Sequence, residues 1–260
     1  METMFNCLVG VLLLGSAIGL GVDDYCLAKY CLPEQQNVGC NPPPTRGGPA
    51  CAGKSAQSIN VEPIGRFIIP DLHNRLRSKL ATGKLEGFDS AVRMPALVWD
   101  DELARQAGHN ARSCVYAHDA CRNTKRFRFV GQNLAFANTS DGSNSSVDKL
   151  IQKWSSEYNV TTQAQLDRFP EKTTALPISH FAQMISDRAW KIGCAVQTWN
   201  ESDVTNVYFV CNYSFANFEG QPVYRRGLQA SQCRTGENDF YPGLCSFKEH
   251  IISTPNAITN

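Results

Sequence analysis

The sequence predicts an α+β fold in which helices and strands stack in layers. Segments with the three- to four-residue apolar spacing of a helix dominate the first part of the chain, and strand-like segments dominate the later part. The two types do not alternate regularly, as they would around a parallel sheet. Eleven cysteines are more than a reduced cytosolic enzyme usually carries. We therefore expect an α+β domain that is stapled by disulfides.

The first predicted helix follows residue 64. Apolar residues with the spacing of one helical face are Phe67, Ile68, Leu72, Leu76 and Leu80. Pro70 lies inside this pattern and cannot donate an intrahelical hydrogen bond. Two alternatives remain open: the helix is kinked at Pro70, or its regular part begins there.

Two further helices are predicted from their start signals. Asp100 suits an N-cap, with Asp101 and Glu102 in the first turn, and this helix is expected to end near Cys114. Ser145 or Ser146 suits the cap of a third helix. The buried side of the second helix is predicted to be Leu103, Ala104, Ala107 and Ala111, and the third carries Val147, Leu150, Ile151, Trp154 and Tyr158 at helical spacing.

Three segments are typical of strands: residues 129–136, 190–199 and 204–213. The last two are separated by the polar residues Asn200 to Asp203, which suit a turn. We therefore predict an antiparallel hairpin near the end of the domain.

The two ends of the chain are expected to lie outside this main domain. Residues 8–20 form an apolar run too short to span a bilayer comfortably, which predicts a signal peptide over residues 1–21 and a secreted protein. Residues 22–60 are interpreted as a cysteine-rich extension, residues 61–220 as the domain, and residues 221–260 as a C-terminal extension with one small disulfide loop. No second apolar run could span a membrane.

Removal of the signal peptide leaves ten cysteines, an even number, as a disulfide framework requires. None of them forms a C-x-x-C pair, which argues against zinc-ribbon and thioredoxin-like sites. Sequons for N-glycosylation agree with secretion and occur at Asn138, Asn144, Asn159, Asn200 and Asn212, the first two being the preferred sites.

Composition excludes several classes of function. A formal net charge of +1 argues against a general nucleic-acid binder, and 42% hydrophobic residues argue against a disordered chain. The sequence contains no P-loop, no G-x-G-x-x-G and no G-x-S-x-G motif, so neither nucleotide binding nor a serine hydrolase is predicted. His73, His109 and His250 are interpreted as surface or helix-packing residues.

Seven short motifs follow one another between about residues 64 and 218. They are Leu72-His73-Asn74-x-x-Arg77, Leu97-Val98-Trp99-Asp100-x-x-Leu103-Ala104, Cys114-x-x-x-His118-Asp119-x-Cys121-Arg122, Gly131-Gln132-Asn133-Leu134-Ala135, Trp154-x-x-Glu157-Tyr158-Asn159, Ser179-His180-Phe181-x-Gln183-Met184 and Val210-Cys211-Asn212-Tyr213. In this order they resemble the CAP superfamily of cysteine-rich secretory, antigen 5 and pathogenesis-related proteins, especially its insect antigen 5 branch of venom and salivary allergens. The resemblance implies a three-layer α-β-α sandwich, the CAP or SCP domain, in a secreted and generally non-enzymatic protein.

The resemblance also implies a disulfide pairing, which ten cysteines alone would leave open. The implied pairs are Cys26 with Cys40, Cys31 with Cys121, Cys51 with Cys114 and Cys194 with Cys211, which leaves Cys233 for Cys245.

The fold implied by the resemblance brings His118, Glu157 and His180 together. Two imidazoles and a carboxylate are suitable ligands for a divalent ion such as zinc and leave a position for water. The family often has a glutamate at a fourth position, where this chain has Gln132, as the antigen 5 branch commonly does. Without that carboxylate, metal affinity and general-base catalysis are both reduced. The cluster is therefore predicted to be either a weak zinc site or a hydrogen-bonded group that holds the cleft.

The predicted function is binding without catalysis in an extracellular fluid such as saliva, venom, seminal fluid or haemolymph. No cofactor is required and no nucleic acid is expected; the partner is a small apolar ligand, such as a lipid, or a protein receptor. Some relatives hold lipids in a channel between helices, and the corresponding residues here are Leu72, Leu76, Leu150, Ile151 and Trp154, which as an apolar stripe would equally form a core. The rival hypothesis is a metal-dependent hydrolase that uses His118, Glu157 and His180.

Overall fold

The computed structural model describes residues 24–61, 65–139, 146–171 and 177–252. The predicted signal peptide and the sequon at Asn144 lie outside these residues. The helices and strands in chain order are η1 (Ala28–Tyr30), η2 (Pro49–Cys51), β1 (Gln57–Ile59), α1 (Gly65–Ala81), β2 (Val98–Trp99), α2 (Asp101–Ala111), β3 (Gly131–Thr139), α3 (Val147–Ser155), η3 (Ser156–Val160), α4 (Gln163–Asp167), α5 (Ser179–Met184), β4 (Lys191–Glu201) and β5 (Val204–Tyr213).

The centre of the molecule is a sheet in the order β1-β4-β5-β3, in which neighbouring strands are antiparallel. The short strand β2 pairs in parallel with another stretch of β4. The predicted hairpin is confirmed. Strand β5 has the predicted bounds, while β4 extends two residues beyond its expected end, to Glu201 opposite Val204. The turn is therefore only two residues long, and Ser202 adopts a positive φ of 55°, as such tight turns require.

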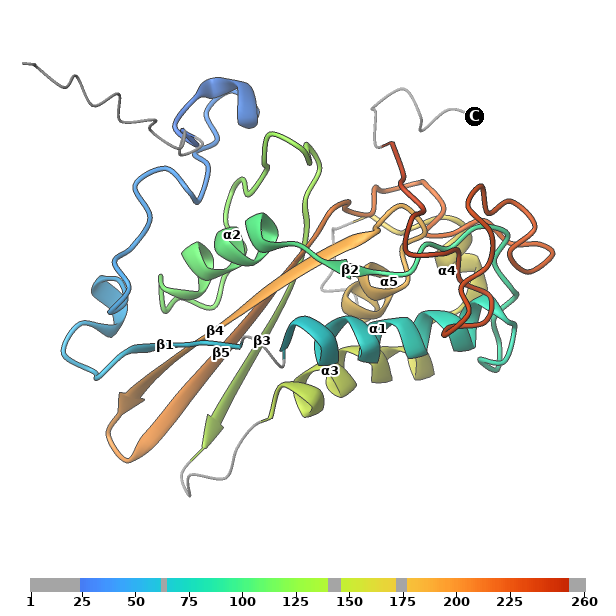
Figure 1. The fold of residues 1–260 in the computed structure, drawn as a ribbon. Coiled ribbons are helices and arrows are strands. Elements are labelled where there is room, and N and C mark those ends of the chain that lie inside the picture. Colours follow the sequence, from blue (N-terminus) through green and yellow to red (C-terminus); the bar gives the residue numbers. More distant parts are fainter. Residues whose placement is uncertain (1–23, 62–64, 140–145, 172–176, 253–260) are drawn as a thin grey trace, which may run out of the picture.

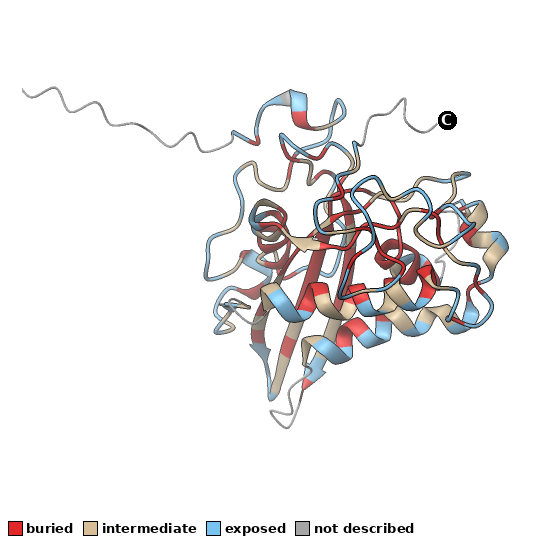
Figure 2. Ribbon diagram, turned by 45° about the vertical axis from the view of Figure 1, so that its right-hand side comes forward, coloured by how far each residue is buried: buried red, intermediate tan, exposed pale blue. Residues whose placement is uncertain are grey.

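Helices cover both faces of this sheet (Figure 1). Because side chains alternate along a strand, β5 directs Tyr208 and Val210 towards Ala107 of α2, and Phe209 towards Trp154 of α3 on the opposite face. Figure 2 shows buried residues along the strands and along the inward sides of the helices. The predicted α+β class and three-layer α-β-α architecture are confirmed.

Helix α1 corrects the prediction made from apolar spacing. The helix continues through Pro70, so its regular part does not begin there. Phe67 and Ile68 are exposed at 75% and 45%, and Leu72 and Leu76 are only half-buried. The buried face is rotated relative to the predicted one, and its members are Ile69, Pro70, His73, Asn74, Arg77, Leu80 and Ala81.

The polar residues on this face are buried because backbone carbonyl groups accept their hydrogen bonds. Arg77 is fully buried and donates hydrogen bonds to the carbonyl oxygens of Pro95, Met184, Ser186 and Ala189. Its burial lowers the pKa of the guanidinium to about 9. Carbonyl dipoles replace the water that this cation loses, so α1 holds together two segments that come from distant parts of the chain.

The other two predicted helices agree more closely with the structure. The side chain of Asp100 accepts hydrogen bonds from the backbone N–H groups of Glu102 and Leu103, which confirms the N-cap of α2. Helix α3 begins at Val147, directly after Ser146, but the Ser146 side chain makes no capping hydrogen bond.

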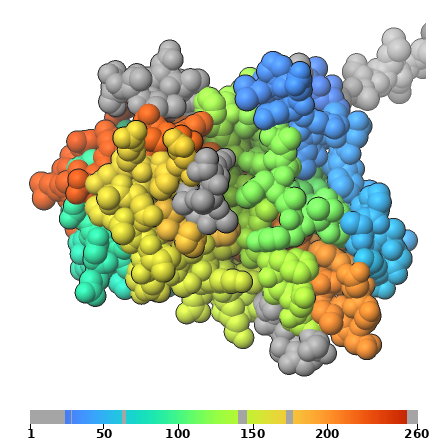
Figure 3. Space-filling view, turned by 180° about the vertical axis from the view of Figure 1, so that it is seen from behind, coloured from blue at the N-terminus to red at the C-terminus, as the bar shows by residue number. Residues whose placement is uncertain are grey.

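The chain has five disulfides, Cys26–Cys40, Cys31–Cys121, Cys51–Cys114, Cys194–Cys211 and Cys233–Cys245, and two of them tie the N-terminal segment to the domain. Four of them are the pairs that the family resemblance implies, and Cys233–Cys245 is the pair that remained. Cys31–Cys121 and Cys51–Cys114 attach the N-terminal segment, residues 24–60, beside the residues that follow α2 (Figure 3). Bridges that close such long loops restrict the unfolded chain strongly.

A buried carboxylate ties the C-terminal segment, residues 221–252, to the domain, while Cys233–Cys245 closes a loop inside the segment. Glu249 pairs with Arg93 and accepts hydrogen bonds from the backbone N–H groups of Arg234 and Thr235. Within the described ranges, every helix is too short or too polar to cross a membrane.

Candidate functional site

The first imidazole of the predicted cleft is fixed by an amide. His118 lies in the loop after α2, and its Nδ1 atom is 2.7 Å from Oε1 of Gln132 on β3. The amide nitrogen of Gln132 donates to Asp119 Oδ2 at 2.9 Å and to Asn212 Oδ1 at 3.0 Å. Because the nitrogen is committed as a donor, Oε1 must accept. His118 Nδ1 therefore carries the proton, and Nε2 of the neutral ring keeps its lone pair.

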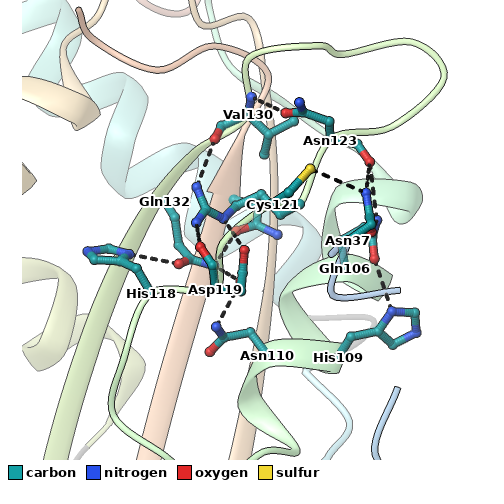
Figure 4. Close-up of polar contacts among 12 residues, drawn as sticks. Asn37, Gln106, His109, Asn110, His118, Asp119, Cys121, Asn123, Val130 and Gln132 are labelled. Carbon is teal, nitrogen blue, oxygen red and sulfur yellow. Dashed lines mark hydrogen bonds and ion pairs between the residues drawn. The ribbon is translucent and has the colours of Figure 1, made fainter. Parts of the chain in front are cut away.

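Asp119 organises the polar groups around His118. Its Oδ1 accepts from Arg122 Nε at 2.6 Å, while Oδ2 accepts from Asn110 at 2.8 Å and from Gln132 at 2.9 Å. Figure 4 shows Asn110 and Gln132 converging on this carboxylate from α2 and β3. Only 9% of the Asp119 side chain is exposed. Both of its oxygens are therefore engaged in holding the cleft.

The second imidazole is fixed by Glu157. Glu157 Oε1 is 2.6 Å from His180 Nδ1, and Oε2 accepts from the backbone N–H groups of His180 and Phe181 at 2.9 and 3.0 Å. A carboxylate accepts hydrogen bonds, so His180 Nδ1 is the donor of this bond. Glu157, on η3, thus secures the first turn of α5 and orients its histidine.

The two imidazoles share one electrostatic environment. The pKa of His118 is lowered, first by desolvation and also by the charges of Arg122 and His180, while the hydrogen bond to Gln132 opposes the shift. Across the described residues, no group of three His, Cys, Asp or Glu side chains is arranged to hold a metal ion. The donor set near a metal here would thus be two imidazole nitrogens.

The contacts of Glu157 differ from those expected of a metal ligand. The sequence motifs suggested Glu157 as a third ligand beside His118 and His180. Both of its oxygens instead accept hydrogen bonds from α5, the arrangement that a carboxylate has when it orients a histidine from behind. Of the predicted alternatives, the hydrogen-bonded cluster describes the contacts around Gln132 and Glu157.

The residues predicted to line an apolar channel contribute to the core. Leu150, Ile151 and Trp154 of α3 are at most 5% exposed and belong to the cluster between the helices and the sheet. The Trp154 ring stacks on Phe209 and on His180, with centroids 5.1 and 5.9 Å apart, and its Nε1 donates to the carbonyl of Leu134. Trp154 therefore contacts both the core and His180.

A buried hydrogen-bond chain supports His180 from the other side. Asn133 donates from Nδ2 to the carbonyl oxygen of His180 and to the hydroxyl of Tyr213. That hydroxyl lies 2.9 Å from His73 Nε2, and His73 Nδ1 donates to the carbonyl of Ile69. His73 is completely buried, so its interpretation as a surface residue is wrong, whereas helix packing is right. His109 is 8% exposed and bonds to Gln106 on its own helix.

Sequence reasoning missed Asp119, Asn110 and Asn133 as parts of this site. Asp119 and Asn133 stand next to His118 and Gln132 in the motifs, which is the one signal that pointed to them. Asn110 lies eight residues before His118 and reaches Asp119 only because the loop after α2 turns back.

Comparison with known proteins places this arrangement in a family. The CAP family model, the cysteine-rich secretory protein family, matches residues 71–213. Venom allergen-1 of Aedes aegypti is 41% identical over 235 residues, which cover 88% of this chain and 91% of that protein. Antigen 5 like allergen Cul n 1 of Culicoides nubeculosus is 44% identical over 144 residues, which cover 55% of this chain and 66% of that protein.

Solved structures agree with the fold. The crystal structure of NaASP2 with Zn2+ is 25% identical, with a TM-score of 0.59 over 70% of this chain and 95% of that one. The structure of BmVAL-1, at 24% identity, has a TM-score of 0.61 and covers 75% of this chain and 98% of that one. From its motifs, its layers and these matches, the chain belongs to the CAP family of cysteine-rich secretory proteins, in the branch of antigen 5-like venom allergens.

Proposed function

We propose that this protein acts outside the cell by binding a protein partner, and that it does not catalyse hydrolysis. One observation carries the proposal: the two carboxylates beside the histidines are held by donors of the protein itself. Glu157 accepts three hydrogen bonds from α5, and Asp119 accepts three from Arg122, Asn110 and Gln132. A general base needs an oxygen directed at the water that it activates, whereas each oxygen of both carboxylates already accepts from the protein.

Packing favours a protein partner over a small apolar ligand. A lipid channel between α1 and α3 would need an open space at Leu150, Ile151 and Trp154, which are buried against the sheet. An apolar ligand at this place would have to displace Trp154 from its stacking contacts with Phe209 and His180. The disulfides and the names of the relatives, venom allergens and antigen 5-like allergens, support an extracellular setting.

Native mass spectrometry of the protein secreted from insect cells, followed by organic extraction, tests whether the protein carries a small apolar ligand. We expect the mass of the polypeptide with its glycans and no species that leaves with the solvent. An extractable apolar mass that is present in the wild-type protein and absent from the Trp154→Ala variant would show a lipid carrier. Leu228→Ala is the matched control, because Leu228 is 78% exposed in the C-terminal segment.

Zinc binding is a second candidate function with its own observation. Both histidines are held by Nδ1, so both direct an Nε2 lone pair away from the group that holds them. This is how histidine ligands are oriented in metal sites, and NaASP2, at 25% identity, has a structure with Zn2+. With two imidazoles as the donor set, the residues fit zinc only as a weak site.

Calorimetric titration with zinc chloride tests this second candidate. We expect weak binding that is lost in His118→Gln and His180→Gln but kept in His250→Gln, a control that removes an imidazole packed on Trp190. Equal affinity in all four proteins would reject the cleft as the zinc site. The hydrolase hypothesis would be supported only if a purified sample cleaved a model ester and His118→Gln abolished this activity.

A further inference from the structure

Five cations gather around the loop of residues 122–130 and form what we call the basic patch. Its members are Lys29, Lys125, Arg126, Arg128 and Lys191. They come from the N-terminal segment, the loop and the start of β4, and the first two of these segments lie side by side (Figures 1 and 3). The cleft residues described above are not among them.

Aromatic rings hold four of these cations in fixed positions. The Tyr30 ring lies beneath both Lys29 Nζ and the Arg128 guanidinium, at 5.3 and 5.5 Å from its centroid. The Trp190 ring likewise lies beneath Arg126 and Lys191, at 5.1 and 5.3 Å. Two cations on one ring are kept near each other despite their repulsion, which the attraction of each to the π system offsets in part.

The loop itself is rigidly built. The Thr124 hydroxyl accepts from the backbone N–H groups of Arg126 and Phe127, and the Thr124 N–H donates to the carbonyl of Phe127. The Phe127 side chain is buried in a small cluster with Trp190, while Arg126 and Arg128 on either side are exposed. A partner would therefore bind these cations with little ordering cost.

Charge in the basic patch is poorly compensated. Arg126 pairs with Asp100 at 3.2 Å, but its side chain remains 51% exposed. Lys125 is exposed and, within the described part of the chain, its side chain has no ion pair. Burial and the charge of Arg126 lower the pKa of Lys191, while Asp100 and Asp101 oppose the shift. The formal net charge of the whole chain is only +1, so this excess of positive charge is local.

We propose that the basic patch binds a sulfated glycosaminoglycan chain. Such a polymer presents closely spaced sulfates to a row of fixed cations, and counterion release then supplies most of the affinity. Single-stranded nucleic acid is a poorer fit, because its bases need exposed aromatic faces. Tyr30, Phe127 and Trp190 are only 3%, 3% and 6% exposed, and cations cover Tyr30 and Trp190. The inference goes beyond the protein-binding role and does not depend on it.

Binding to a size-defined heparin oligosaccharide, measured over a series of NaCl concentrations, tests the proposal. The test variant is Lys125→Gln with Arg128→Gln. The control is Lys79→Gln with Lys84→Gln, which removes the same charge from exposed lysines of α1 and the following turn. We expect the slope of log Kd against log[NaCl] to fall by about two in the test variant, one for each lost contact, and to stay unchanged in the control.

Three results would overturn the proposal. One is the absence of heparin binding by the wild-type protein at physiological salt. Another is an equal decrease of the salt-dependence slope in the test and control variants, because the attraction of heparin to the protein would then be non-specific. The third is tighter binding of a single-stranded oligonucleotide of matched charge. Circular dichroism and the thermal midpoint of each variant confirm that the proteins compared are folded.

Discussion

Replacement of Glu157 by glutamine separates its role in orienting His180 from a role in binding metal. The Glu157→Gln variant keeps the shape of the side chain but exchanges one carboxylate oxygen for an amide nitrogen. The remaining carbonyl oxygen can still accept from the backbone N–H groups of His180 and Phe181, in which case the amide faces His180 Nδ1 as a donor. The imidazole must then move its proton to Nε2 or lose the hydrogen bond.

The size of the effect follows from these three contacts. A hydrogen bond to a charged group contributes about 1.5–3 kcal/mol, and a neutral one contributes about 0.5–1.5 kcal/mol. Glu157→Gln makes the two backbone hydrogen bonds neutral and reverses or removes the one to His180 Nδ1. The Glu157 and His180 side chains are 17% and 28% exposed, so water screens part of the loss. We expect a decrease of about 2 kcal/mol in the free energy of unfolding.

Guanidinium chloride unfolding at pH 7 with the disulfides intact measures this decrease. Glu201→Gln is the matched control, because Glu201 is 59% exposed and pairs with Lys54 at the surface. That variant should differ from the wild type by no more than about 0.5 kcal/mol. If Glu157→Gln were as stable as the control, the three hydrogen bonds would not hold α5, and the role assigned to Glu157 would be wrong.

Three other predictions follow from buried groups. Burial lowers the pKa of His73 to about 4, so between pH 6.5 and 4 the unfolded chain binds more protons than the folded one. The free energy of unfolding should therefore fall by on the order of 3 kcal/mol as the pH drops through this window. Urea titrations should show a smaller fall in the His73→Gln variant. Asp119→Ala breaks the ion pair with Arg122 and removes one hydrogen-bond acceptor from Asn110 and one from Gln132, so chemical unfolding should show a loss of about 3 kcal/mol, and an unchanged midpoint would contradict the role of Asp119 in holding these residues. Asn212 is fully buried whereas Asn138, Asn159 and Asn200 are exposed, so peptide mapping of the secreted protein should find glycans on the exposed sequons and none on Asn212.

The sequence predicted well those elements whose signals lie close together along the chain. Asp100 is followed by two acidic residues and an apolar stripe, and this pattern specifies the start of α2 without help from the rest of the molecule. The hairpin of β4 and β5 is similarly local, because its turn lies between two strand-forming runs. The disulfide pairs, by contrast, needed the family resemblance, since spacing alone leaves their connectivity open.

The misjudged elements depend on distant partners. The exposed position of Phe67 and the burial of Arg77 reverse what apolar spacing predicts for α1, because four carbonyl groups, one just before β2 and three at or after the end of α5, solvate the guanidinium. These segments come together only in the folded chain. Glu157 was correctly placed beside His180, but its hydrogen bonds to the backbone of α5 depend on the position of that helix. No periodicity in the sequence encodes either contact.

The central claim is that His118 and His180 are both held by Nδ1, and long-range proton–nitrogen NMR correlation of the histidine side chains measures this most directly. In the wild-type protein near pH 8, His118 and His180 should both show a protonated Nδ1, because Gln132 Oε1 and Glu157 Oε1 accept from Nδ1. The assignments are made with His118→Gln and His180→Gln. An unprotonated Nδ1 on either ring would contradict the hydrogen-bond network from which the binding function and the zinc candidate are both argued.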